Sequence, residues 1–153
     1  MHKAIAIIIL LALTSISVGC NVGICLWNMG YSQLKVKPEK SELIGIYLLN
    51  EVSNGNLTKQ GYNVSHTKLK IENDGTYILT DVPASILNQS DKTSSTIIKA
   101  GRWFVDCKES YGCMIELEGV CVVPLSAKKG RLAVPITIGD PDQCEGIILE
   151  KVK

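Results

Sequence analysis

The feature that most constrains this chain is an alternation of apolar and polar residues, in short stretches, from Leu43 to the end. Leu69 and Ile71 alternate with charged neighbours, and the stretch from Leu132 to Ile138 alternates just as cleanly. A period of two is typical of strands that bury one face. Asn73-Asp74-Gly75 lies between two such stretches and favours a hairpin turn, because Asp-Gly tolerates a positive φ.

About eight such stretches, separated by turn signals, predict an all-β domain folded as an antiparallel up-and-down barrel or as a sandwich. No stretch after residue 42 has a helical period, and Ser53-Asn54-Gly55-Asn56 is interpreted as a turn. Trp103 and Cys107 share the inward strand parity, so Trp103 is expected to be a core anchor or, alternatively, the wall of a ligand pocket. Pro135 lacks an N–H, which predicts an edge strand or a bulge.

The N-terminus has the layout of an export segment, with a basic start at Lys3 and an unbroken apolar run from Ala4 to Leu13. Val18-Gly19-Cys20 resembles the bacterial lipobox, in which the cysteine is diacylated and the preceding bond is cut; Ser17 departs from that pattern. The resemblance implies a lipoprotein signal peptide over residues 1–19 and lipidation at Cys20. Two alternatives stay open: ordinary signal cleavage, and an uncleaved anchor over Ala4–Trp27, which is long enough to span a bilayer.

All three alternatives place the domain outside the cytoplasm, in the cell envelope. Asn21 follows the lipobox cysteine where an Asp would favour the inner membrane, which points to an outer-membrane lipoprotein facing the periplasm. Residues 20–42 show no sustained period and are interpreted as a tether, and residues 43–153 are assigned to the folded domain.

Five short motifs recur at the turns and strands of this stretch: Gly45-Ile46-Tyr47, Asp74-Gly75-Thr76-Tyr77, Gly101-Arg102-Trp103, Ile115-Glu116-Leu117 and Ile138-Gly139-Asp140-Pro141-Asp142. In this order they resemble the small lipocalin-like lipoproteins and secreted domains of bacteria. The resemblance covers residues 43–152 and implies an up-and-down β-barrel that holds an apolar ligand. It supplies no catalytic residues.

Six cysteines in an exported chain favour a disulfide framework. Cys107 and Cys113 flank a short loop on the same parity, so a bridge between them is expected. Cys121 and Cys144 are the natural second pair. If Cys20 is acylated, Cys25 remains as the cysteine without a predicted disulfide partner.

Little in the sequence points to catalysis. His66 is the only histidine after the export segment, and it lies on the polar parity of its strand. Asp140, Asp142 and Glu145 lack the ligand ladder of a calcium loop, so no metal site and no cofactor is expected. The formal charge of +1 excludes the basic footprint of a nucleic-acid-binding protein.

Three functions follow as hypotheses. The first is a non-catalytic envelope lipoprotein with a binding or structural barrel. The second is a periplasmic inhibitor or immunity protein against a lysozyme-like or toxin enzyme, with the loop Lys108-Glu109-Ser110-Tyr111-Gly112 as the surface that binds the partner; an ordinary hairpin loop is the alternative. The third and least supported is a hydrolase. The expected partners are the membrane, through the N-terminal lipid or helix, and an apolar small molecule or a protein.

The lipobox resemblance predicts that the mature chain begins at an acylated Cys20. Protein extracted from membranes should therefore have the mass of residues 20–153 plus the lipid. An uncut chain, or a mature chain without lipid, would contradict the prediction.

Overall fold

The computed structural model describes residues 28, 30–87, 95–139 and 144–153. The export segment, Cys20, Cys25, most of the loop expected at Asn88 to Ser95, and the turn Asp140-Pro141-Asp142 lie outside these ranges. Among the described residues, no helix is long and apolar enough to cross a membrane.

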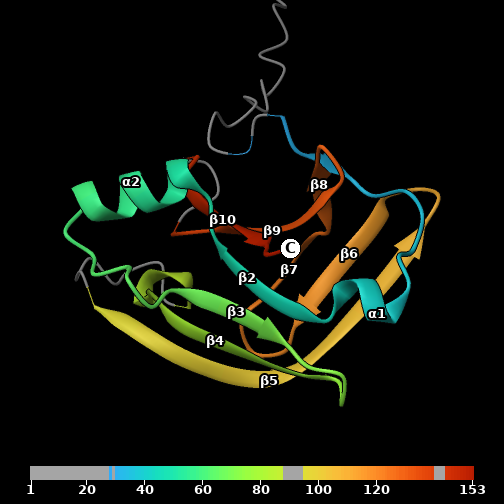
Figure 1. The fold of residues 1–153 in the computed structure, drawn as a ribbon, viewed down its shortest axis with the longest axis horizontal. Coiled ribbons are helices and arrows are strands. Elements are labelled where there is room, and N and C mark those ends of the chain that lie inside the picture. Colours follow the sequence, from blue (N-terminus) through green and yellow to red (C-terminus); the bar gives the residue numbers. More distant parts are fainter. Residues whose placement is uncertain (1–27, 29, 88–94, 140–143) are drawn as a thin grey trace, which may run out of the picture.

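The described residues form one antiparallel sheet of ten strands, curved into a nearly closed barrel (Figure 1). In chain order the elements are β1 (Ser32–Gln33), α1 (Lys40–Leu43), β2 (Gly45–Leu49), α2 (Glu51–Lys59), β3 (Lys68–Ile71), β4 (Thr76–Pro83), the 3-10 helix η3 (Ala84–Ile86), β5 (Thr96–Lys108), β6 (Gly112–Leu117), β7 (Cys121–Pro124), β8 (Ser126–Lys128), β9 (Arg131–Thr137) and β10 (Gly146–Lys151). The sheet order is β1-β8-β9-β10-β2-β3-β4-β5-β6-β7. The all-β prediction is confirmed, as a barrel and not a sandwich.

The expected number of strands is recovered once β7 and β8 are counted together. Only Leu125 separates them, and the chain leaves its β6 partner there to pair with β9. The meander from β2 through β10 then holds eight strands, and β10 pairs with β2, so the meander returns to its start.

The bend at Leu125 opens a gap in the barrel wall, and the N-terminal segment fills it. The Leu34 N–H donates to the Leu125 carbonyl (2.9 Å), and the Leu34 carbonyl accepts from the Cys113 N–H (2.8 Å). The Leu125 N–H donates in turn to the Cys113 carbonyl (2.9 Å). We call this set of three residues the seam. It joins the regions of β1 and β7, the two ends of the sheet order.

The interpretation of residues 20–42 as a tether is therefore wrong for its described C-terminal part. β1 pairs with β8, and α1 begins with a capping box in which Glu39 and Glu42 satisfy each other's backbone N–H groups. β1 has only two residues, too few to display a period, so its place in the barrel comes from tertiary pairing.

The interior of the barrel is filled by side chains. Tyr47 and Tyr77 are fully buried, and each hydroxyl donates to a backbone carbonyl at 2.7 Å, that of Leu43 and that of Glu118 respectively. Trp103 is also buried, and its indole N–H donates to the Glu72 carbonyl (3.1 Å). Burial of each large apolar side chain contributes about 1.5–3 kcal/mol. Trp103 is thus a core anchor, as expected.

The prediction that no helix follows residue 42 is wrong, because α2 occupies Glu51–Lys59. The Asn50 side chain caps the helix by accepting from the Ser53 N–H (2.8 Å). Ser53 is buried, and its hydroxyl accepts from the Ile148 N–H of β10 (2.9 Å), while Leu57 enters the core. A segment rich in Ser, Asn and Gly has poor helix propensity, so these contacts hold α2 beside β10 and β2 (Figure 1).

The prediction of an edge strand at Pro135 is wrong, because β9 pairs with β8 on one side and with β10 on the other. Pro135 itself faces Ile148 of β10, whereas β8 pairs with β9 only as far as Ala133. On its β8 side, the described structure therefore demands no ladder hydrogen bond from Pro135.

A substitution at Gly112 tests whether the N-terminal segment packs against β6. Its φ is +76°, and a Cβ there would lie 2.8 Å from the Leu34 carbonyl oxygen. Gly130 is a matched control, with φ +77° and nothing within 4 Å of a Cβ. Gly130→Ala should cost about 1 kcal/mol for the backbone conformation alone. Gly112→Ala should cost about 2–4 kcal/mol, because the β1 segment must also move. Urea unfolding measures both, and equal costs would show that the N-terminal segment is not packed against β6.

Candidate functional site

The β5–β6 hairpin holds the loop that the sequence singled out. Cys107 and Cys113 face each other across the two strands, with Cα atoms 4.0 Å apart, and form a disulfide, as expected. Lys108 pairs with Gly112, so only three residues remain between the strands. The Tyr111 N–H donates to the Lys108 carbonyl, and Gly112 takes the positive φ that closes such a turn. The expected five-residue loop is therefore a tight turn.

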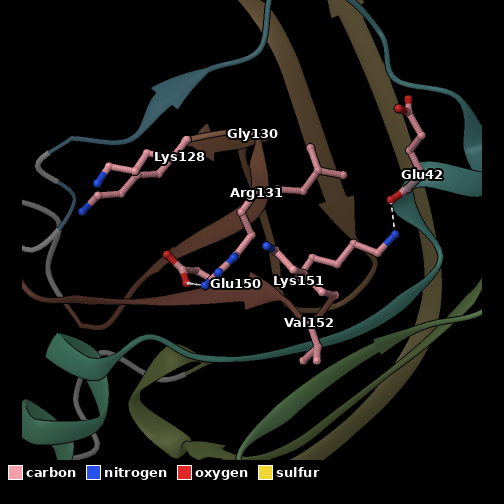
Figure 2. A pocket seen from close by; sticks show the side chains of 10 residues that line it. Glu42, Lys128, Gly130, Arg131, Glu150, Lys151 and Val152 are labelled. Atoms are coloured by element: carbon pink, nitrogen blue, oxygen red, sulfur yellow. Dashed lines mark hydrogen bonds and ion pairs between the residues drawn. The ribbon is translucent and has the colours of Figure 1, made fainter.

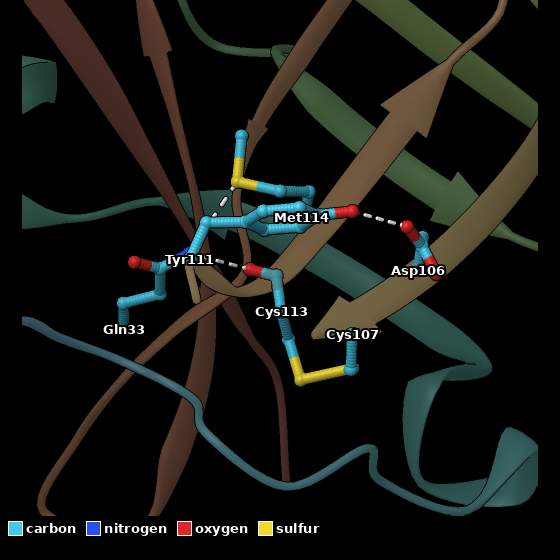
Figure 3. The surroundings of a disulfide bond; sticks show 6 residues. All are labelled: Gln33, Asp106, Cys107, Tyr111, Cys113 and Met114. Carbon is cyan, nitrogen blue, oxygen red and sulfur yellow. Dashed lines mark hydrogen bonds between the residues drawn. A yellow bond between two sulfur atoms is a disulfide. The ribbon is translucent and has the colours of Figure 1, made fainter. Parts of the chain in front are cut away.

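Tyr111 folds back onto the outer surface of the hairpin (Figure 3). Its hydroxyl donates to the Asp106 carboxylate, and Tyr111 lines the same hollow as Met114. The Lys108 amine lies 5.4 Å from the centre of the ring and 3.8 Å from the Asp106 carboxylate. The hydrogen bond from Tyr111, followed by the charge of Lys108, lowers the pKa of Asp106. These groups are exposed, so the contacts orient Tyr111 more than they stabilise the fold.

Tyr111 belongs to a larger outward-facing surface across three strands. Phe104 of β5 lies opposite Glu116 of β6, which lies opposite Val122 of β7. Asp106 lies opposite Met114 in the neighbouring row. We call this surface the β5–β7 face; it lines a shallow hollow of about 420 Å³ and consists of Phe104, Asp106, Tyr111, Met114, Glu116 and Val122.

The β5–β7 face exposes large apolar side chains between two carboxylates. The exposed fractions are 49% for Phe104, 39% for Tyr111 and 59% for Val122. Of these residues, only Tyr111 was predicted from the sequence to bind a partner. The signal for Phe104 was available: because Trp103 and Val105 point inward, the residue between them must point outward.

The β1 strand also contacts this face. The Gln33 side-chain amide donates to the Cys113 carbonyl (2.9 Å) and contacts the Met114 sulfur (3.3 Å) (Figure 3). The disulfide closes a small loop, which stabilises the hairpin by about 2–3 kcal/mol. The strands that carry the β5–β7 face are thus fixed by a covalent bond and by β1.

The predicted Cys121–Cys144 disulfide is wrong. Cys121 is a free thiol, whereas Cys144 is disulfide-bonded to a different partner. Cys121 begins β7, whose strand neighbour is β6, whereas Cys144 precedes β10, which lies between β9 and β2. The strand order therefore does not place β7 beside β10, and sequence spacing could not reveal this.

The remaining candidate residues from the sequence are His66 and the acidic residues Asp140, Asp142 and Glu145. His66 is exposed, as expected from its parity. In the described ranges, no three His, Cys, Asp or Glu side chains come together in a way that would hold a metal ion. Asp140 and Asp142 lie outside those ranges.

Comparison with known proteins adds no assignment: no family model, no curated protein and no solved structure matches this chain.

The Cys121 thiol provides a chemical test of the cysteine arrangement. Burial raises its pKa to about 12, against 9.0 for an ordinary thiol, so the neutral form persists well above pH 9. A raised pKa stabilises the fold fully below pH 9, and this stabilisation is lost as the pH rises towards 12. At pH 9, iodoacetamide should label Cys121 at least about a hundredfold more slowly in native protein than in urea. Peptide mapping measures the labelling at Cys121, and fast labelling of native protein, or a Cys121–Cys144 peptide, would refute this arrangement.

Proposed function

We propose that this chain is an exported, envelope-tethered, non-catalytic lipoprotein whose barrel binds a protein partner through the β5–β7 face. The observation that carries the proposal is the set of large apolar side chains exposed on a surface braced by the Cys107–Cys113 disulfide. Aromatic side chains and methionine are enriched at protein interfaces, and a rigid surface loses little entropy on binding.

The chemistry of the face indicates the kind of partner. Asp106 and Glu116 lie among the apolar side chains, and Glu109 lies in the adjacent turn. A partner that presents Lys or Arg side chains around an apolar group would complement both features. The filled interior supports an external protein partner over an apolar small molecule inside the barrel.

Envelope attachment is supported by the sequence of the export segment and by a disulfide in the folded domain. Disulfides such as Cys107–Cys113 persist in oxidising compartments, including the periplasm. Acylation at Cys20, or an uncleaved helix over Ala4–Trp27, would hold the domain at the membrane, with the outer membrane as the proposed location.

The inhibitor or immunity function is the alternative. A protruding loop that plugs an enzyme cleft is less supported than a flat contact, because the turn between β5 and β6 has only three residues. An inhibitor that acts through a flat, acidic and apolar surface would use the β5–β7 face itself.

A photocrosslinking amino acid at Phe104 tests whether the face binds a partner. In cells, this position should capture a defined protein, and the same probe at Ile98 should not. Ile98 is the matched control, because it lies on β5, shares the outward parity and is more exposed, at 64%.

Affinity for the captured protein then tests which residues bind it. Phe104→Ala and Tyr111→Ala should each weaken binding by about 1–2 kcal/mol or more while the melting temperature holds. Ile98→Ala and His66→Ala should leave the affinity unchanged. If neither of the first two substitutions weakens binding, the β5–β7 face is not the interface; if His66→Ala abolishes the biological effect in a folded protein, the non-catalytic proposal fails.

A further inference from the structure

A second surface lies on the β8–β9 hairpin and the end of β10. An open hollow of about 710 Å³ lies there, and several Lys and Arg side chains line it (Figure 2). We call it the basic hollow; its lining consists of Glu42, Lys128, Lys129, Gly130, Arg131, Leu132, Glu150, Lys151, Val152 and Lys153. Lys128, Lys129 and Arg131 lie at the turn between β8 and β9, and the lysines near residue 153 join them only in the fold.

The basic hollow carries an excess of positive charge. Five cationic side chains face two carboxylates, which leaves a net side-chain charge of +3. Arg131 is paired with Glu150 (2.8 Å), and the Lys151 amine donates to the Glu42 backbone carbonyl. Within the described residues, Lys129 and Lys153 have no ion-pair partner. After residue 19 the chain has 15 basic and 15 acidic side chains, so this excess reflects a separation of charge within a neutral domain.

The basic hollow lies where the chain enters the barrel. The Lys128 amine lies 4.8 Å from the centre of the Tyr31 ring, and the Tyr31 hydroxyl donates to the Glu150 carboxylate. The Asn50 side chain donates to the same hydroxyl (2.9 Å). Tyr31 is thus fixed against two residues that line the hollow. The described chain therefore passes the basic hollow at Tyr31, just before β1.

The sequence before this entry point is the proposed membrane attachment. Ala4–Trp27 has no charge, and Trp27 is only three residues from Gly30, a reach of at most about 10 Å. If Cys20 carries the lipid, the ten residues to Gly30 reach at most about 35 Å. Either attachment holds the basic hollow close to lipid headgroups, and a short tether greatly raises their effective concentration.

We propose that the basic hollow docks the barrel on the anionic headgroups of the membrane that holds the N-terminal segment. Lys128, Lys129 and Lys153 supply the charge, because a negatively charged leaflet attracts basic side chains within about one Debye length. Val152 lines the same hollow, is 47% exposed and adds an apolar contact at the interface. The inference rests on the proposed envelope attachment and deepens it, because docking would orient the domain as well as retain it.

Amide hydrogen exchange of the full chain in nanodiscs tests the docking. The discs are made of phosphatidylcholine alone or of phosphatidylcholine with phosphatidylglycerol. Amides of residues 128–131 and 151–153 should exchange more slowly in the anionic discs, by on the order of tenfold, and the difference should vanish at high salt. The Asn73-Asp74-Gly75 turn, with no basic cluster, serves as the internal reference.

Two double variants make the test specific. Lys128→Gln with Lys129→Gln should remove the protection in anionic discs. Lys68→Gln with Lys99→Gln removes the same charge from exposed positions of β3 and β5 and should leave the protection intact.

The outcomes separate docking from attachment. Equal exchange in both kinds of disc, with the chain still attached, overturns the docking and leaves the attachment standing. A chain that stays with anionic discs only at low salt overturns the attachment and supports the docking. A chain that separates from both kinds of disc overturns both.

Discussion

The fold depends on three backbone hydrogen bonds among Leu34, Cys113 and Leu125. A curved sheet that stops short of closure leaves strand edges with unpaired N–H and carbonyl groups, and such edges invite pairing with other chains. Here the chain bends at Leu125 away from β6, and the residues next to β1 satisfy the groups that this bend exposes. The N-terminal segment is therefore part of the barrel wall.

The barrel is nearly closed and its interior is filled by side chains, so the surfaces proposed for binding lie on its outside. Tyr47, Tyr77 and Trp103 occupy the core with their polar atoms satisfied. Two outer surfaces then differ in charge and in proposed role. The β5–β7 face combines apolar side chains with carboxylates and suits a protein partner, whereas the basic hollow suits anionic headgroups. Because carboxylates are repelled by an anionic membrane, docking through the hollow would leave the β5–β7 face available.

The sequence predicts the parts of this structure that depend on local pattern. Alternation at Leu69 and Ile71 and the Asp74-Gly75 turn identify the β3–β4 hairpin, and equal parity identifies the Cys107–Cys113 pair. The features that depend on strand order or on tertiary contacts were missed. The helix α2 depends on the hydrogen bond from the Ile148 N–H to the Ser53 hydroxyl. The pairing of Cys121 with Cys144 could be rejected only by knowing which strands lie beside β7 and β10. The lysines of the basic hollow likewise converge only after β10 pairs with β9.

The seam closes the barrel wall, and the exchange rates of individual backbone amides measure its stability most directly. The N–H groups of Leu34, Cys113 and Leu125 all donate within the seam. If the N-terminal segment is part of the barrel wall, these three amides should exchange only through global unfolding, with the same opening free energy as the core strands. Exchange of Leu34 and Cys113 through a local opening well below that free energy would show that the segment detaches from an otherwise folded barrel, and would contradict the account.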